Sequence, residues 1–125
     1  MDPLSDTPIS IRALLALALK SARTAPDLER AMAAYDRGEF ADAESLLLVA
    51  GHAGNPYAQE LLGFMYAIGP DLYPGIWRSL EAAKNWFARA SSQGRPPSQY
   101  MHVAFARRGT IQVRADIMAG FSAAA

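Results

Sequence analysis

Only two side chains in the sequence, His52 and His102, could act as imidazole acids or bases near neutral pH. Neither has a carboxylate at a spacing typical of a catalytic pair or a metal site, so ordinary structural histidines are the favoured interpretation. Because the chain has no cysteine, thiolate nucleophiles, thiolate metal sites and disulfides are all excluded.

The other candidate groups also have simpler structural explanations. Glu39, Asp42 and Glu44 cluster at the start of a predicted helix, where the helix dipole favours negative charge, so capping is preferred over metal binding. Ser91 and Ser92 lack a nucleophile elbow, and neither a phosphate-binding loop nor a dinucleotide fingerprint occurs anywhere. The sequence therefore predicts a protein that is not an enzyme and that binds no metal and no cofactor.

Composition indicates a folded helical chain. The 125 residues suffice for one domain, 51% of them are apolar, and the 25 alanines favour closely packed helices. Twelve basic and twelve acidic residues give a formal net charge of zero, so electrostatic binding to nucleic acid has no obvious source. A nucleic-acid partner is not expected.

The apolar segment near the start of the chain is a poor membrane anchor. Residues 9–19 are mostly apolar but include Arg12, Lys20 follows them, and a membrane span needs about 20 apolar residues. Asp2 and Asp6 also make the leading residues acidic, unlike the basic start of a signal peptide. We expect no membrane insertion and a cytoplasmic location, with a periplasmic or exported protein as the alternative.

Capping residues mark the starts of the predicted helices. A helix over residues 7–23 would begin at Thr7, and Thr24 with Asp27 three residues later would begin a second helix that stops at Gly38. Further helices are predicted from Phe40 to Ala53, from Pro56 to Gly69, from about Leu80 to Gly94 after a loop at 70–75, and from Pro96 to Gly109, with a weaker one after Thr110. No stretch alternates as a strand would, so the predicted fold class is all-α.

The sequence repeats itself approximately every forty residues. A shift of forty superimposes turn and capping residues of one segment on those of the next, which indicates a helical repeat. The matched pairs are Gly54 with Gly94, Pro56 with Pro96, Gln59 with Gln99 and Gly69 with Gly109. One domain is therefore expected, with the N-terminal helix at 7–23, a short first repeat at 26–54, the best repeat at 55–94 and a degenerate repeat or cap at 96–125.

The best copy resembles a Sel-one-like repeat, a member of the tetratricopeptide-like helical repeats. The residues that carry the resemblance follow the family pattern in order: Ala58, Leu61, Leu62, Gly63, Met65, Tyr66, Gly69, Ala83, Trp86, Phe87, Ala90 and Gly94. The resemblance implies a short right-handed stack of antiparallel helix hairpins that scaffolds protein complexes, often in bacteria. The chain departs from the family in its long loop at 70–78 and in its last copy, where Val103 replaces the glycine.

The motif has a physical explanation of its own. Gly63 would let two helices approach without a side chain between them, and Trp86 and Phe87 could fill the gap between hairpins. This motif is architectural rather than catalytic.

Partner binding is the function that these features favour. The candidate contacts are aromatic residues on the loop and at helix starts, where aromatics often anchor interfaces, and two arginines that the helix dipole alone could also explain. These candidates are Tyr57, Tyr73, Trp77, Tyr100, Arg107 and Arg108. For Trp77, the sequence favours neither a position in the core nor a contact with a partner.

We expect an adaptor or accessory subunit that holds another protein, as part of a larger complex, through its concave helix face and the loop at 70–78. The alternative is an inhibitor or immunity-type protein that blocks one specific target. The apolar first helix, Leu14 to Leu19, is expected to dock on its own domain, with insertion into a partner's groove as the other possibility.

Overall fold

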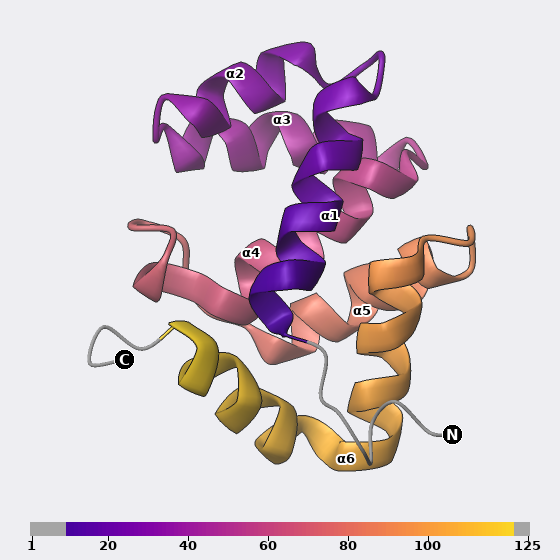
Figure 1. Ribbon diagram of the computed structural model, residues 1–125. Coiled ribbons are helices and arrows are strands. Elements are labelled where there is room, and N and C mark those ends of the chain that lie inside the picture. The colour runs from indigo at the N-terminus through magenta and orange to yellow at the C-terminus, as the bar shows by residue number, and fades with distance from the viewer. Residues whose placement is uncertain (1–9, 122–125) are drawn as a thin grey trace.

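The computed structural model describes residues 10–121, and within them the chain is helical without a strand. Its elements are α1 Ile11–Thr24, α2 Glu29–Asp36, α3 Phe40–His52, α4 Pro56–Ile68, the 3-10 helix η1 Gly69–Asp71, α5 Leu80–Ser91 and α6 Pro96–Phe121 (Figure 1). The predicted all-α class is confirmed. Over the same residues, no helix has both the length and the hydropathy needed to cross a membrane.

The first helix begins slightly later than the sequence suggests. Ser10 caps α1, because its hydroxyl oxygen accepts a hydrogen bond from the backbone amide of Ala13 at 3.4 Å. Thr7, the expected cap of a helix over residues 7–23, lies outside the described residues. At the other end, α1 stops within one residue of the expected position.

The expected capping box of the second helix is wrong. Thr24 is the last residue of α1, and its hydroxyl donates to the carbonyl of Ser21 at 3.0 Å instead of capping the second helix. α2 begins only at Glu29, and Leu28 precedes it without a side-chain cap. A threonine at a helix end bonds as readily to the preceding turn, and here that local bond prevails over the capping role.

The capping role expected for the three carboxylates is only partly right. Asp42 does lie in the first turn of α3. Glu39 makes no capping hydrogen bond and pairs instead with Arg37 at 3.0 Å, and the hydrogen bond from that guanidinium lowers the pKa of the Glu39 carboxyl. Glu44 accepts a hydrogen bond from the hydroxyl of Tyr66. Two of the three acids therefore bind side chains and not the helix end.

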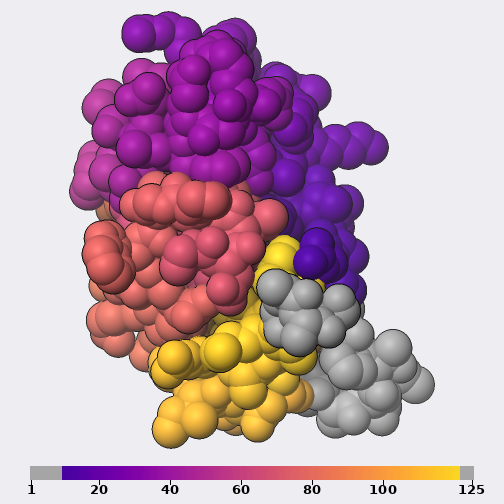
Figure 2. All heavy atoms as spheres, turned by 90° about the vertical axis from the view of Figure 1, so that its left-hand side faces the viewer, coloured from indigo at the N-terminus to yellow at the C-terminus, as the bar shows by residue number. Residues whose placement is uncertain are grey.

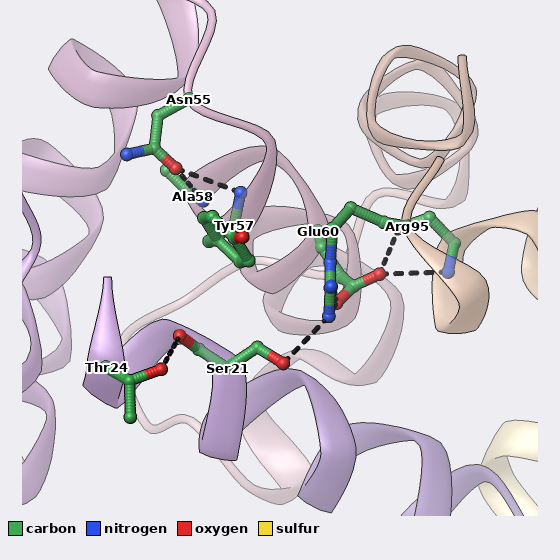
Figure 3. Close-up of polar contacts among 8 residues, drawn as sticks. Ser21, Thr24, Asn55, Tyr57, Ala58, Glu60 and Arg95 are labelled. Carbon is green, nitrogen blue, oxygen red and sulfur yellow. Dashed lines mark hydrogen bonds and ion pairs between the residues drawn. The ribbon is translucent and has the colours of Figure 1, made fainter. Parts of the chain in front are cut away.

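The predicted starts of the two central helices are confirmed. The side-chain oxygen of Asn55 accepts hydrogen bonds from the amides of Tyr57 at 2.9 Å and Ala58 at 3.1 Å (Figure 3). Ser79 caps α5 in the same way, accepting from the amide of Ala82 at 3.1 Å. Both caps satisfy amides that have no partner inside the helix, which fixes where α4 and α5 begin.

The last helix is bent at the predicted break. Gly109 has φ 84° and ψ 160°, values that a helix does not contain and that glycine adopts without strain, so α6 consists of two segments. An ion pair of 2.9 Å joins Arg108, before the bend, to Asp116, after it. The second segment is the weaker helix expected from Thr110.

Consecutive helices from α2 to α6 pack against one another, with the most extensive contact between α4 and α5. α1 departs from this order, because it packs on α4 and α6, touches α2, and passes in front of α4 in Figure 1. Its buried residues are Leu14, Leu15, Ala18 and Ala22. Docking of the first helix on its own domain is thus confirmed, and α1 covers part of α4 and α6.

The close helix approach predicted at Gly63 is confirmed. A Cβ atom placed on Gly63 would lie 2.6 Å from the ring of Phe87, which is fully buried and also packs edge-on against Phe64 with ring centres 4.9 Å apart. In a second close contact, a Cβ on Gly51 would lie 3.1 Å from the ring of Trp86. These two aromatic side chains hold α5 against α4 and α3.

Candidate partner-binding surface

The loop between α4 and α5 is anchored in the core. Tyr73 is fully buried, with its ring 5.1 Å from that of Phe40 and its hydroxyl 2.7 Å from that of Tyr35. Burial raises the pKa of both tyrosines above the ordinary value. Ile76 is buried as well. The expectation that Tyr73 contacts a partner is therefore wrong, because its side chain packs in the interior and positions the loop.

A second set of contacts closes the base of the same loop. Gly69 has φ 67° and lies so near Arg78 that a Cβ atom there would be 2.7 Å from the Cβ of Arg78. The Arg78 guanidinium donates to the carbonyl of Ile68 and to the carboxylate of Asp71, each at 2.9 Å. The buried Ile76 and the bound Arg78 thereby fix the backbone on both sides of residue 77.

That residue, Trp77, is turned outward. Trp77 is 87% exposed, and Ile111 on the second segment of α6 is 88% exposed. Both line one shallow hollow of about 530 Å³, which we call the Trp77 surface. Its residues are Pro70, Trp77, Arg78, Leu80, Thr110, Ile111 and Arg114. The sequence left a core position and a partner contact as alternatives for Trp77, and its exposure excludes the core position.

Figure 2 shows the side of the molecule on which this loop lies, with the segment that follows α4 between the α2–α3 pair above and the second segment of α6 below. Residues from two distant parts of the chain, 70–80 and 110–114, meet there. The Trp77 surface therefore exists only in the folded protein.

The other predicted aromatic contacts lie elsewhere. Tyr57, at the start of α4, is half-buried, and the guanidinium of Arg95 lies over its ring at 4.8 Å. Tyr100 is also half-buried and lines a separate hollow of about 330 Å³ together with Met101 and Asp116. The structure does not bring these tyrosines to Trp77, so the predicted aromatic residues do not form one site.

The predicted arginines are likewise outside the Trp77 surface. Arg107 is exposed on the first segment of α6, whereas Arg108 is half-buried and paired with Asp116. Arg114, which sequence reasoning did not single out, lines the surface beside Ile111. The spacing of three residues places Arg114 on the same helix face as Ile111, but only the tertiary fold brings that face to the loop.

The sequence also offered no indication of a buried polar cluster around Glu60 (Figure 3). The carboxylate of Glu60, fully buried on α4, accepts hydrogen bonds from the amide and hydroxyl of Ser98 at 3.0 and 2.7 Å and pairs with Arg95 at 2.9 Å. Arg95 also donates to the hydroxyl of Ser21 on α1 at 3.0 Å. The carboxylate thus caps the start of α6 from another helix, which is a structural role.

The residues considered for catalysis lie apart. His52 is on α3, with its ring 5.0 Å from that of Trp86, and His102 is exposed on α6. Across residues 10–121, no three side chains among His, Asp and Glu gather closely enough to hold a metal ion. The two histidines therefore do not belong to one site.

A third hollow, of about 760 Å³, runs between α2 and α3. Apolar side chains such as Leu46 and Val49 form its walls, and Val49 is 74% exposed. Asp27, Glu29 and Arg30 lie around it. Its mixed charges make it less distinctive than the Trp77 surface.

No protein-family model matches the chain, and neither a curated protein nor a solved structure matches it. The resemblance to Sel-one-like repeats therefore rests on the residues quoted for it, and the function rests on the surfaces described above.

Proposed function

We propose that the chain is a non-catalytic protein-interaction module, an adaptor or accessory subunit of a larger protein complex, and that its partner contacts the Trp77 surface. The observation that carries this proposal is the outward position of Trp77 on a fixed loop. Trp77 is 87% exposed although Ile76 beside it is 2% exposed and Arg78 is bound to the end of α4. Local flexibility does not account for that exposure.

Such a residue is well suited to bind a protein. Tryptophan and arginine are enriched among the residues that dominate binding energy, and a loop ordered in advance loses little entropy on binding. Burying a side chain the size of Ile111 against a partner contributes about 1.5 to 3 kcal/mol, and the larger Trp77 contributes at least as much. Two exposed apolar side chains in one hollow therefore favour a contact surface over solvent exposure.

We infer that residues 55–94 form a Sel-one-like hairpin, preceded by a shorter copy in 26–54 and followed by a degenerate copy in 96–125, in a short right-handed stack. Support comes from the tight packing of Phe87 on Gly63 and from the complete burial of the motif alanines. These alanines are Ala58, Ala83 and Ala90. A short series of repeats has a small core, which suits a protein that works in a complex.

The test compares capture by three variants in extracts of the native host. Trp77→Ala and Ile111→Ala should lose the companion proteins that the wild-type chain retains, since each removes an exposed contact. Val49→Ala is the matched control, because Val49 is exposed but lies on α3. Circular dichroism should show equal helix content throughout. Capture of the same companions by all variants would refute the proposal.

An activity assay on the captured companion then separates the two forms of the proposal. An adaptor leaves its partner active or joins it to a third protein, whereas an inhibitor or immunity-type protein abolishes the activity. The proposed location is the cytoplasm, with a periplasmic or exported protein as the alternative.

A further inference from the structure

The geometry of the Trp77 surface points to the chemistry of its partner. We propose that it binds a protein segment that is both acidic and apolar, in which a carboxylate pairs with Arg114 while a neighbouring apolar side chain packs on Trp77 and Ile111. This inference rests on the proposed function, since it names the kind of segment that the same surface accepts.

Charge is the first argument. Two arginines and no acidic residue line the surface. Arg78 is already committed to Asp71 and to the carbonyl of Ile68. Arg114 is exposed, and no carboxylate in residues 10–121 lies within ion-pair distance of it. A partner therefore meets one uncommitted guanidinium, which a carboxylate complements.

The second argument is the position of that charge. Ile111 and Arg114 are three residues apart on α6 and share one face of the helix, and Trp77 lines the same hollow. A guanidinium offers paired donors in a fixed plane that matches the two oxygens of a carboxylate. The surface thus places an apolar site and an anion site next to each other, which a short amphipathic segment can fill together.

Other occupants fit less well. Nucleic acid requires several cations along its path, whereas this surface has one uncommitted arginine and the chain has no net charge. A second copy of the chain could offer Asp27 or Glu29 from the α2–α3 hollow, but Arg30 lies beside them and offsets one of the two charges. An anionic membrane would attract Trp77 and Arg114 only through a small patch.

The experiment begins with a library of random peptides displayed on phage. The library is selected on the folded protein and depleted on Trp77→Ala, so that only sequences that depend on this surface remain. These sequences should combine Asp or Glu with large apolar residues. Enrichment of neutral or basic sequences, or of no sequence that depends on Trp77, would overturn the inference.

A charge exchange then tests the assigned contact. With a selected peptide made synthetically, Arg114→Glu should weaken binding about tenfold or more, and replacing the peptide's acidic residue by lysine should restore it. Arg30→Glu is the control, because Arg30 is exposed on α2 and should leave the affinity unchanged. Equal binding to the wild-type protein and to Arg114→Glu would overturn the contact.

Two further measurements address the other occupants. One measures binding to vesicles of phosphatidylserine and phosphatidylcholine, and the other measures concentration-dependent self-association. If either kind of binding requires Trp77 while acidic peptides do not bind, the inference is overturned. Failure here is distinguishable from failure of the proposed function. If companions from the host still require Trp77 but not Arg114, the interaction module stands and only the acidic partner is wrong.

Discussion

Gly63 and Phe87 set the distance between α4 and α5. Because a Cβ atom on Gly63 would lie 2.6 Å from a ring that is fully buried, Gly63→Ala must displace that ring. Overpacking costs about 1 to 3 kcal/mol, whereas the better helix propensity of alanine returns about 1 kcal/mol. We expect the free energy of unfolding, measured in urea, to fall by up to about 2 kcal/mol.

Gly120 provides the matched control for that change, since it lies in α6 and a Cβ atom there would meet nothing within 4 Å. Gly120→Ala should leave stability unchanged or raise it. Phe87→Leu in the Gly63→Ala background should also reduce the cost of the alanine, because neighbouring sites are not additive. Equal effects of alanine at Gly63 and Gly120 would contradict a tight contact between α4 and α5.

Tyr73 and Tyr35 predict a loss of stability at alkaline pH. Burial raises the pKa of both hydroxyls above the ordinary value of about 10 that they regain on unfolding. The stabilisation is complete below that value and is lost as pH rises above it, because the unfolded chain then releases protons that the folded chain keeps. Urea unfolding across this range should show a falling free energy.

The variant Tyr73→Phe isolates this effect. It removes one of the two paired hydroxyls, so the free energy of unfolding should decline less steeply above pH of about 10 than in the wild-type protein. A small constant loss of about 1 kcal/mol for the hydrogen bond to Tyr35 is expected at neutral pH. An unchanged alkaline slope would show that Tyr73 ionises normally in the folded state.

At the scale of elements, Glu60 determines how α6 is joined to α4. Glu60→Gln keeps the shape of the side chain but leaves Arg95, whose side chain is only 16% exposed, without its counter-ion. Breaking a buried pair in this way costs about 3 to 5 kcal/mol. We expect a large loss of thermal stability and faster amide exchange at the start of α6, near Ser98.

The double variant Glu60→Gln with Arg95→Met tests whether the two groups act together. If they form one pair, the combined loss should be clearly smaller than the sum of the single losses. Additive losses would mean that Glu60 acts on Ser98 alone, through the two hydrogen bonds at the helix start.

Local side-chain chemistry was enough to predict several of these elements. The cap at Asn55 and the break at Gly109 follow from the residue types themselves. The capping roles predicted for Thr24 and Glu39 were wrong for the same physical reason. Each side chain binds a nearby residue instead of the helix end, and the sequence alone does not show which of the two bonds is stronger.

The candidate surface could be predicted only in part. Tyr73 and Trp77 are both aromatic residues of one loop, and only the tertiary fold decides that Tyr73 meets Phe40 while Trp77 faces solvent. The contact of Glu60 with Ser98, 38 residues away, and the place of Arg114 beside the loop also depend on how distant helices meet. Spacing along the chain carries no signal for such meetings.

At the scale of the whole molecule, α1 joins helices that are distant in the sequence. Leu15 is 5% exposed in the core that α1 shares with α4 and α6. Leu15→Ala should therefore lower the free energy of unfolding by about 2 to 5 kcal/mol, and the loss should affect the entire molecule in one transition.

Two probes measure that cooperativity. In a Trp77→Phe background the buried Trp86 is the one tryptophan left, so its fluorescence reports the core while circular dichroism reports all helices. Leu15→Ala should shift the two urea midpoints equally. Separate midpoints would mean that α1 undocks before the other helices unfold.

The contact of α1 with the end of α6 also has a topological consequence. The Arg12 guanidinium donates to the carbonyl of Gly120 at 2.6 Å and lies 4.4 Å from the ring centre of Phe121. Residues 108 positions apart in the chain are therefore neighbours in space. A short linker could join these two places, and the chain could be reopened at the turn before Asn55, which would give a circular permutant with the same core and the same Trp77 surface.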